Sequence, residues 1–175
     1  EQANKVLIQI LEDKNQEPIV RHEAGEALGA IATPAILEIL EKYSKDECVE
    51  VAETCQLAIN RIKWLKNDSK VEEGKLSKNI YNSVDPAPPL INSNLSQLKS
   101  IFLNEEESLF NRYRAMFSLR NLNNDEATLI LCEGLKKNGS LFKHEVAFVL
   151  GQLQNEVSVP YLKEALENED LHEMV

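Results

Sequence analysis

A histidine followed directly by a glutamate occurs twice in matching surroundings along this 175-residue chain. IVRHEAGEALGAI at 19–31 returns as LFKHEVAFVLGQL at 141–153, with a basic residue before each histidine and a glycine six residues after each glutamate. Imidazole and carboxylate together are ligands that suit iron or manganese, whereas a structural zinc site more naturally uses thiolates. The candidate metal ligands are therefore His22, Glu23, His144 and Glu145.

The apolar residues around each pair predict how the histidines are oriented. At about 100° per residue on a helix, the apolar residues of each segment form a compact stripe on the side opposite the histidine. We therefore expect both histidines to point away from the packed face, which excludes a histidine buried in the core. The stripes consist of Ala24, Ala27, Leu28 and Ile31 in one segment, and of Val146, Val149, Leu150 and Leu153 in the other.

Gly29 and Gly151 lie nearly beneath the histidines on the same wheel. A glycine inside a helix costs roughly 0.5–1 kcal/mol relative to alanine. Its repetition suggests that a ligand needs close access to the backbone, with tight packing between helices as the alternative. Glu26 lies about 40° from His22 and could bind a cationic group, but Phe148 replaces it in the second segment.

Composition limits the classes of protein to consider. The net charge of −10 disfavours a nucleic-acid partner. Three cysteines without a CxxC pair indicate reduced thiols rather than a disulfide framework. No secretory signal or membrane-spanning run is evident. We expect a soluble, cytoplasmic protein that does not bind membranes.

Apolar residues recur at three- and four-residue spacing in a series of segments, which predicts an all-α fold. Pro18 and Pro34 stand at helix starts, where a missing N–H is tolerated. Paired helices of this length with short connections are typical of an α-solenoid of HEAT-like repeats. The expected helices are 3–13, 18–32, 34–44, 49–65, 95–103, 109–122, 126–137, 141–154 and 159–168.

A weaker internal match, LEDKNQEPIV at 11–20 with LENEDLHEMV at 166–175, predicts how the repeats are arranged. Its offset of 155 residues exceeds the offset of 122 between His22 and His144 by 33 residues, about one helical pair. We expect two pseudo-symmetric halves, each with two His-Glu helices, of which the chain contains one per half. The expected divisions are 1–65, a linker at 66–94 and 95–175. His172-Glu173 aligns with Glu17-Pro18, so it is not counted as a metal-binding pair.

Several segments together resemble the deoxyhypusine hydroxylases. They are VRHEAGEALGAI, VEVAETCQLAINRIKWL, SVDPAPP, RYRAMFSLRN and LFKHEVAFVLGQLQ, and they run through essentially the whole chain. The resemblance implies a HEAT-repeat monooxygenase that hydroxylates the deoxyhypusine side chain of translation initiation factor 5A, using dioxygen at a non-haem di-iron centre.

The resemblance also implies roles for individual residues. Four His-Glu pairs bind iron in the family, and His22-Glu23 and His144-Glu145 match the second and third. The matching glycines, Gly29 and Gly151, are associated with substrate binding, and Glu26 is a candidate contact for a substrate ammonium group. We expect a fragment that lacks the first and fourth pairs and is inactive alone.

Two other classes of protein remain open. A metal-free HEAT-repeat module could use an acidic concave face to bind a basic protein segment. A HEAT-like lyase or scaffold acting on a tetrapyrrole-bearing protein shares the ALGAI pattern, but it does not explain the repeated His-Glu pair. Iron analysis, and partner binding after alanine replacement of His22 and His144, distinguish the first class from the enzyme.

Overall fold

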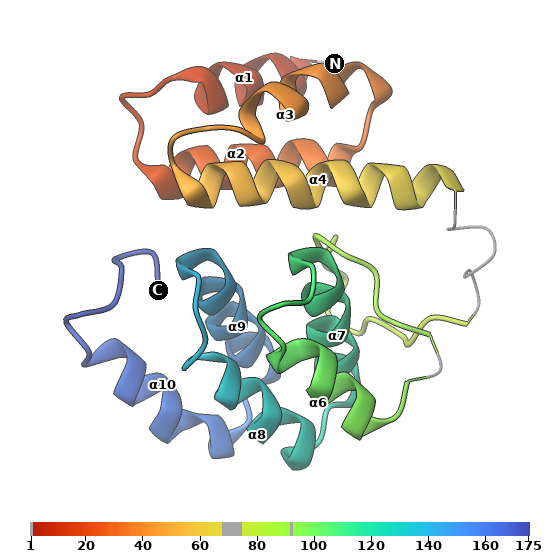
Figure 1. Cartoon of the computed structure of the whole chain (residues 1–175), viewed down its shortest axis with the longest axis vertical. Helices are drawn as coiled ribbons and strands as arrows, with labels where there is room; N and C mark the ends of the chain where they lie inside the picture. Colours follow the sequence, from red (N-terminus) through yellow and green to blue (C-terminus); the bar gives the residue numbers. More distant parts are fainter. Residues whose placement is uncertain (1, 68–74, 92) are drawn as a thin grey trace. The chain divides into compact units, whose positions relative to one another are not determined.

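The computed structural model describes residues 2–67, 75–91 and 93–175, which form two compact units (Figure 1). The first unit comprises Glu1–Glu73 and Val84–Ala87, and the second comprises Gly74–Ser83 and Pro88–Val175. The predicted boundaries at 65 and 95 stay a prediction. The parts of the predicted linker at 68–74 and 92 lie outside the described residues.

The first unit is built from two helical pairs. Helix α1 (Gln2–Glu12) packs against α2 (Pro18–Ile31), and α3 (Leu37–Tyr43), preceded by a 3-10 turn at Pro34–Ile36, packs against α4 (Val49–Asn67). Helices α2 and α4 also pack along each other, so within this unit they form one layer, with α1 and α3 in the other (Figure 1). The buried core includes Leu11, Leu28, Ile36, Leu40, Val51, Cys55 and Ile62.

The second unit repeats this arrangement with different core residues. Its helices are α6 (Leu95–Leu103), α7 (Leu109–Leu122), α8 (Asp125–Gly134), α9 (Ser140–Leu153) and α10 (Val159–Leu166), with a 3-10 turn at Glu156–Ser158. Helices α6 and α7 pair, as do α8 and α9, and α7 also packs against α9. Aromatic side chains dominate this core, which includes Phe102, Tyr113, Phe117 and Phe142.

Local sequence explains where the helices begin. Pro18 and Pro34 occupy the first positions of their helices, as predicted. The side chain of Asn94 accepts a hydrogen bond from the Gln97 N–H, and Gln97 in turn accepts one from the Asn94 N–H, which forms a capping box at the start of α6. The all-α prediction is confirmed, and the bounds of most helices agree to within one or two residues.

The irregular segment 75–91 is held by arginines from both units. In the first unit, Arg61 donates from Nε to the backbone oxygen of Asp85 at 3.0 Å. In the second unit, Arg114 donates to the backbone oxygens of Pro88 at 3.1 Å and Pro89 at 3.2 Å. The segment therefore gains order from side chains of the neighbouring helices, because it has no regular backbone ladder of its own.

Across the described residues, no helix is both long enough and apolar enough to cross a membrane.

Candidate metal centre

His22 is buried beside helix α4. Its side chain is only 2% exposed, and its Nδ1 lies 2.6 Å from Oγ1 of Thr54. The prediction that His22 points away from the packed face is therefore wrong. A helical wheel accounts for one packed face, but α2 contacts α1 on one side and α4 on another. The flank that carries His22 faces the second of these neighbours.

The contact with Thr54 determines which nitrogen of His22 carries the proton. Thr54 Oγ1 donates its hydrogen to the backbone oxygen of Glu50 at 2.7 Å, so it can only accept from His22. Nδ1 is therefore protonated, and Nε2 carries the lone pair. Histidines that bind metal ions almost always donate their other ring N–H to such a partner, which fixes the ring orientation.

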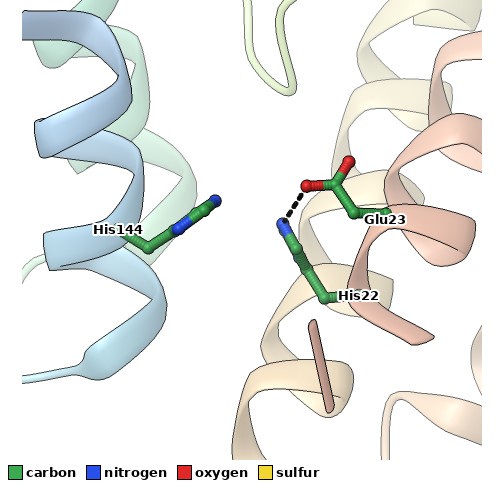
Figure 2. A group of neighbouring side chains, drawn as sticks. All are labelled: His22, Glu23 and His144. Carbon is green, nitrogen blue, oxygen red and sulfur yellow. Dashed lines mark ion pairs between the residues drawn. The ribbon is translucent and has the colours of Figure 1, made fainter. Parts of the chain in front are cut away.

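Two carboxylates lie near that lone pair. His22 Nε2 is 3.8 Å from Oε1 of the exposed Glu23 and 3.8 Å from Oε2 of the half-buried Glu26. The first of these pairs is drawn in Figure 2. Both distances are too long for hydrogen bonds. They fit atoms that share a cation, because two ligands bound at about 2.1 Å lie at most about 4.2 Å apart.

Burial changes the protonation of Glu26, and the neighbouring carboxylates add to the effect. Burial, followed by the charges of Glu23 and Asp85, raises the pKa of Glu26 to about 7. Desolvation and like charge both disfavour the ionised carboxylate. The raised pKa favours the neutral carboxyl of Glu26, and a cation bound nearby would favour its ionised form.

Gly29 has a packing role on the same helix. A Cβ atom at this position would lie 2.6 Å from Cβ of Ala58 on α4, closer than real side chains approach. Its backbone oxygen accepts a hydrogen bond from Arg61 Nη1 at 2.8 Å. The absence of a side chain thus lets α2 and α4 pack closely. Tight packing between helices, the alternative to close access by a ligand, therefore accounts for Gly29.

On α9 the second pair has a similar tautomer but different surroundings. Nδ1 of the half-buried His144 lies 2.9 Å from the backbone oxygen of Met174. A carbonyl oxygen can only accept, so Nδ1 is protonated here too and Nε2 carries the lone pair. Glu145 is buried, with only 4% of its surface exposed. Figure 2 draws His144 as it leaves α9.

The other predicted positions on α9 are open. Gly151 is exposed, and a Cβ atom placed there would meet nothing within 4 Å. Phe148, the counterpart of Glu26, is 54% exposed. The two helices therefore place their glycines in different environments, with Gly29 covered by a neighbouring helix and Gly151 accessible.

Sequence reasoning missed the partners that orient the histidines. Thr54 lies 32 residues after His22, close to one helical-pair repeat, so the repeat length was a usable signal for it. Met174 lies 30 residues after His144, but it contributes a backbone oxygen, which no residue type reveals. Sequence reasoning also missed Asp85, whose charge contributes to the raised pKa of Glu26. It belongs to the first unit but lies in the irregular segment, where periodicity gives no signal.

Comparison with known protein families confirms the repeat architecture. The family described as "PBS lyase HEAT-like repeat" matches residues 20–46, 112–137 and 142–168. The first and third of these ranges contain the two His-Glu pairs. The prediction of HEAT-like helical pairs is thus confirmed.

Individual relatives are much more specific. The chain is 53% identical over 175 residues to a deoxyhypusine hydroxylase of Drosophila melanogaster, covering 99% of this chain and 57% of the relative. It is 52% identical over 164 residues to the Homo sapiens deoxyhypusine hydroxylase, covering 94% of this chain and 53% of the relative.

A solved structure agrees with these relatives. Human deoxyhypusine hydroxylase in complex with glycerol matches with a TM-score of 0.92 and 50% identity, over 99% of this chain and 59% of that one. The chain thus spans just over half the length of the relatives that it matches. The resemblance seen in the sequence motifs is confirmed.

Proposed function

The chain is related to the deoxyhypusine hydroxylases, and from that premise we propose that the protein hydroxylates the deoxyhypusine side chain of translation initiation factor 5A. The reaction would complete hypusine by inserting one oxygen atom from dioxygen. The observation that carries the proposal is the close similarity along nearly the whole chain. Because the chain spans just over half of each relative, the activity is proposed for the full-length protein.

The donor groups on α2 and α9 support a non-haem iron site. Both histidines have protonated Nδ1 atoms held by an oxygen, so both offer Nε2 as a ligand atom. Each is followed by a glutamate, and imidazole with carboxylate suits iron. We propose His22, Glu23, His144 and Glu145 as iron ligands.

The protein and the metal would divide the chemistry between them. Bound iron would supply the activation of dioxygen, which no amino-acid side chain provides. Thr54 and the backbone oxygen of Met174 hold the imidazole rings in a fixed tautomer and orientation. Their rigidity would limit the reorganisation needed when the ligand set binds metal.

Binding of the substrate would rest on the acidic groups and on the open backbone. The deoxyhypusine side chain is a long amine-bearing chain, and carboxylates bind ammonium groups through charge-assisted hydrogen bonds. Glu26 is our candidate for such a contact, since it lies in a cluster of negative charge. Gly151 leaves room for the chain against α9, whereas Gly29 would act by letting α4 pack closely.

The decisive experiment measures turnover and iron together in the full-length protein. With deoxyhypusine-containing factor 5A, dioxygen and a reductant, we expect the substrate to gain one oxygen atom. His144→Ala and Glu145→Gln should lower both the iron content and the turnover. Glu169→Gln, at an exposed site far along the chain from either pair, should change neither.

The same experiment distinguishes the hydroxylase from the alternative, a metal-free binding module. The relatives do not favour it. A full-length protein that binds no iron and performs no turnover, yet still binds factor 5A after replacement of His22 and His144 by alanine, would refute the hydroxylase proposal in favour of the module.

A further inference from the structure

The two His-Glu helices differ at the position one turn beyond the histidine. On α2 this position holds Glu26, whose Oε2 lies 3.8 Å from His22 Nε2. On α9 it holds Phe148. His22 thus has two carboxylates near its Nε2, whereas the residue one turn after His144 can neither ligate a metal nor carry charge.

The face of α9 that carries His144 is open and apolar. On a helix with about 100° per residue, His144, Phe148 and Gly151 fall within an arc of about 60°. Phe148 lies about 6 Å and Gly151 about 10.5 Å along the axis beyond the histidine. Phe148 is 54% exposed and Gly151 is bare, so the strip begins at the histidine and presents an aromatic ring followed by exposed backbone.

The matching strip on α2 is closed. Gly29 packs against Ala58, and Arg61 covers its backbone oxygen. Glu26 takes the place of the aromatic ring. A long, thin ligand therefore finds room along α9 but not along α2, and the ring offers its methylene groups an apolar contact.

We propose that Phe148 contacts the amine-bearing methylene chain of the substrate and sets its direction along α9. This inference rests on the proposed function. Phe148 would act in two ways, since its ring buries methylene surface and its face attracts a nearby ammonium group. The substrate side chain, which is aliphatic and cationic, would thus match both properties of the exposed Phe148 ring.

The test separates binding from chemistry in the full-length, iron-loaded protein. Phe148→Ala should raise KM for deoxyhypusine-containing factor 5A about five- to thirtyfold, with kcat changed less than threefold and the iron content unchanged. Phe148→Tyr keeps the ring and should stay within about twofold of wild type. Phe148→Leu keeps apolar surface without the ring and should fall between them.

The controls distinguish this inference from the proposed function. Val159→Ala removes an exposed apolar side chain from α10 and should leave KM unchanged. Wild-type turnover with an unchanged KM in Phe148→Ala would overturn only the role of Phe148. Absence of turnover in the iron-loaded wild type would overturn the proposed function and this inference with it. A KM in Phe148→Leu equal to wild type would overturn the contribution of the ring face.

Discussion

Helices α2 and α9 carry the same His-Glu-Gly pattern, yet the fold treats the two copies differently. On α2 the histidine is 2% exposed and its glycine packs against α4, while the glutamate is exposed. On α9 the glutamate is buried at 4% exposure and the glycine is open, while the histidine is half-buried. A shared motif therefore gives the two helices the same residue types without the same surroundings.

The difference has a physical cause in the neighbours of each helix. The motif sets only the residues of one helix, whereas burial depends on which helix packs along its flank. Helix α4 brings the small side chain of Ala58 against Gly29 and the hydroxyl of Thr54 against His22. On α9, the hydrogen-bond partner of the histidine is the backbone oxygen of Met174, in the segment that follows α10. One histidine is held by a packed helix and the other by the segment that follows α10.

The largest expected difference in stability between the two helices comes from the basic residue before each histidine. Arg21 forms a bidentate pair with Asp46, at 2.6 Å and 3.2 Å, with side chains 6% and 3% exposed. Asp46→Ala would leave the Arg21 charge buried without this partner, so the free energy of unfolding of the metal-free protein should fall by about 3–5 kcal/mol. Lys143→Ala, at the matching half-buried position, should change it by less than about 0.5 kcal/mol. Chemical denaturation of both variants measures the contrast.

The same ion pair predicts a dependence on pH. Hydrogen bonds from Arg21 hold the pKa of Asp46 below its ordinary value of 3.8. A lowered carboxyl pKa stabilises the fold above pH of about 4, and the stabilisation is lost as pH falls further. The difference between wild type and Asp46→Ala should therefore shrink as the pH falls below about 4. A difference below about 1 kcal/mol at pH 7 would contradict the assignment.

The orientation of His22 can be tested without touching a proposed ligand. Thr54→Val removes the acceptor of the Nδ1 proton, so iron affinity of the full-length protein should fall about 10- to 100-fold. The loss of this acceptor for the buried His22 Nδ1–H should also lower the free energy of unfolding by about 1–3 kcal/mol. Thr54→Ser keeps the hydroxyl and should restore both. Iron titration with denaturation in parallel provides the measurement.

A matched threonine separates this effect from a general loss of a helical hydroxyl. Thr128 on α8 is buried and donates to the backbone oxygen of Asn124, as Thr54 does to that of Glu50. Within the part of the chain that the structure describes, Thr128 makes no hydrogen bond to a histidine, so Thr128→Val should keep iron affinity within about twofold of wild type. An equal loss of iron affinity in both valine variants would contradict an orienting role for Thr54.

The last contrast comes from the two glycines, whose replacement by alanine should change stability in opposite directions. Gly29→Ala places a methyl group against Ala58 Cβ and should destabilise the metal-free protein by about 1–3 kcal/mol. Gly151→Ala meets nothing and gains helix propensity, so it should stabilise by about 0.5–1 kcal/mol. Denaturation curves give both values. Loss of stability in both variants would show that α9 is packed as closely as α2.

Most of the secondary structure could be read from the sequence. Pro18 and Pro34 mark helix starts through their own covalent geometry, and the apolar spacing of each segment depends on residues only three or four positions apart. The buried stripe was confirmed at Ala24 and Leu28, but Ile31 is exposed as the last residue of α2. The apolar spacing continues to Ile31, but the helix ends there, so its side chain is not covered.

The sequence by itself determined the helices, the repeat and the identity of the candidate ligands, because these depend on local spacing and on residue type. Only the tertiary structure decided that His22 is buried against Thr54, that Gly29 serves packing and that Gly151 and Phe148 remain open. Those properties depend on which groups of helices and segments about 30 residues away pack against α2 and α9. A helical wheel contains no such neighbours, and so the same letters acquired different roles in α2 and α9.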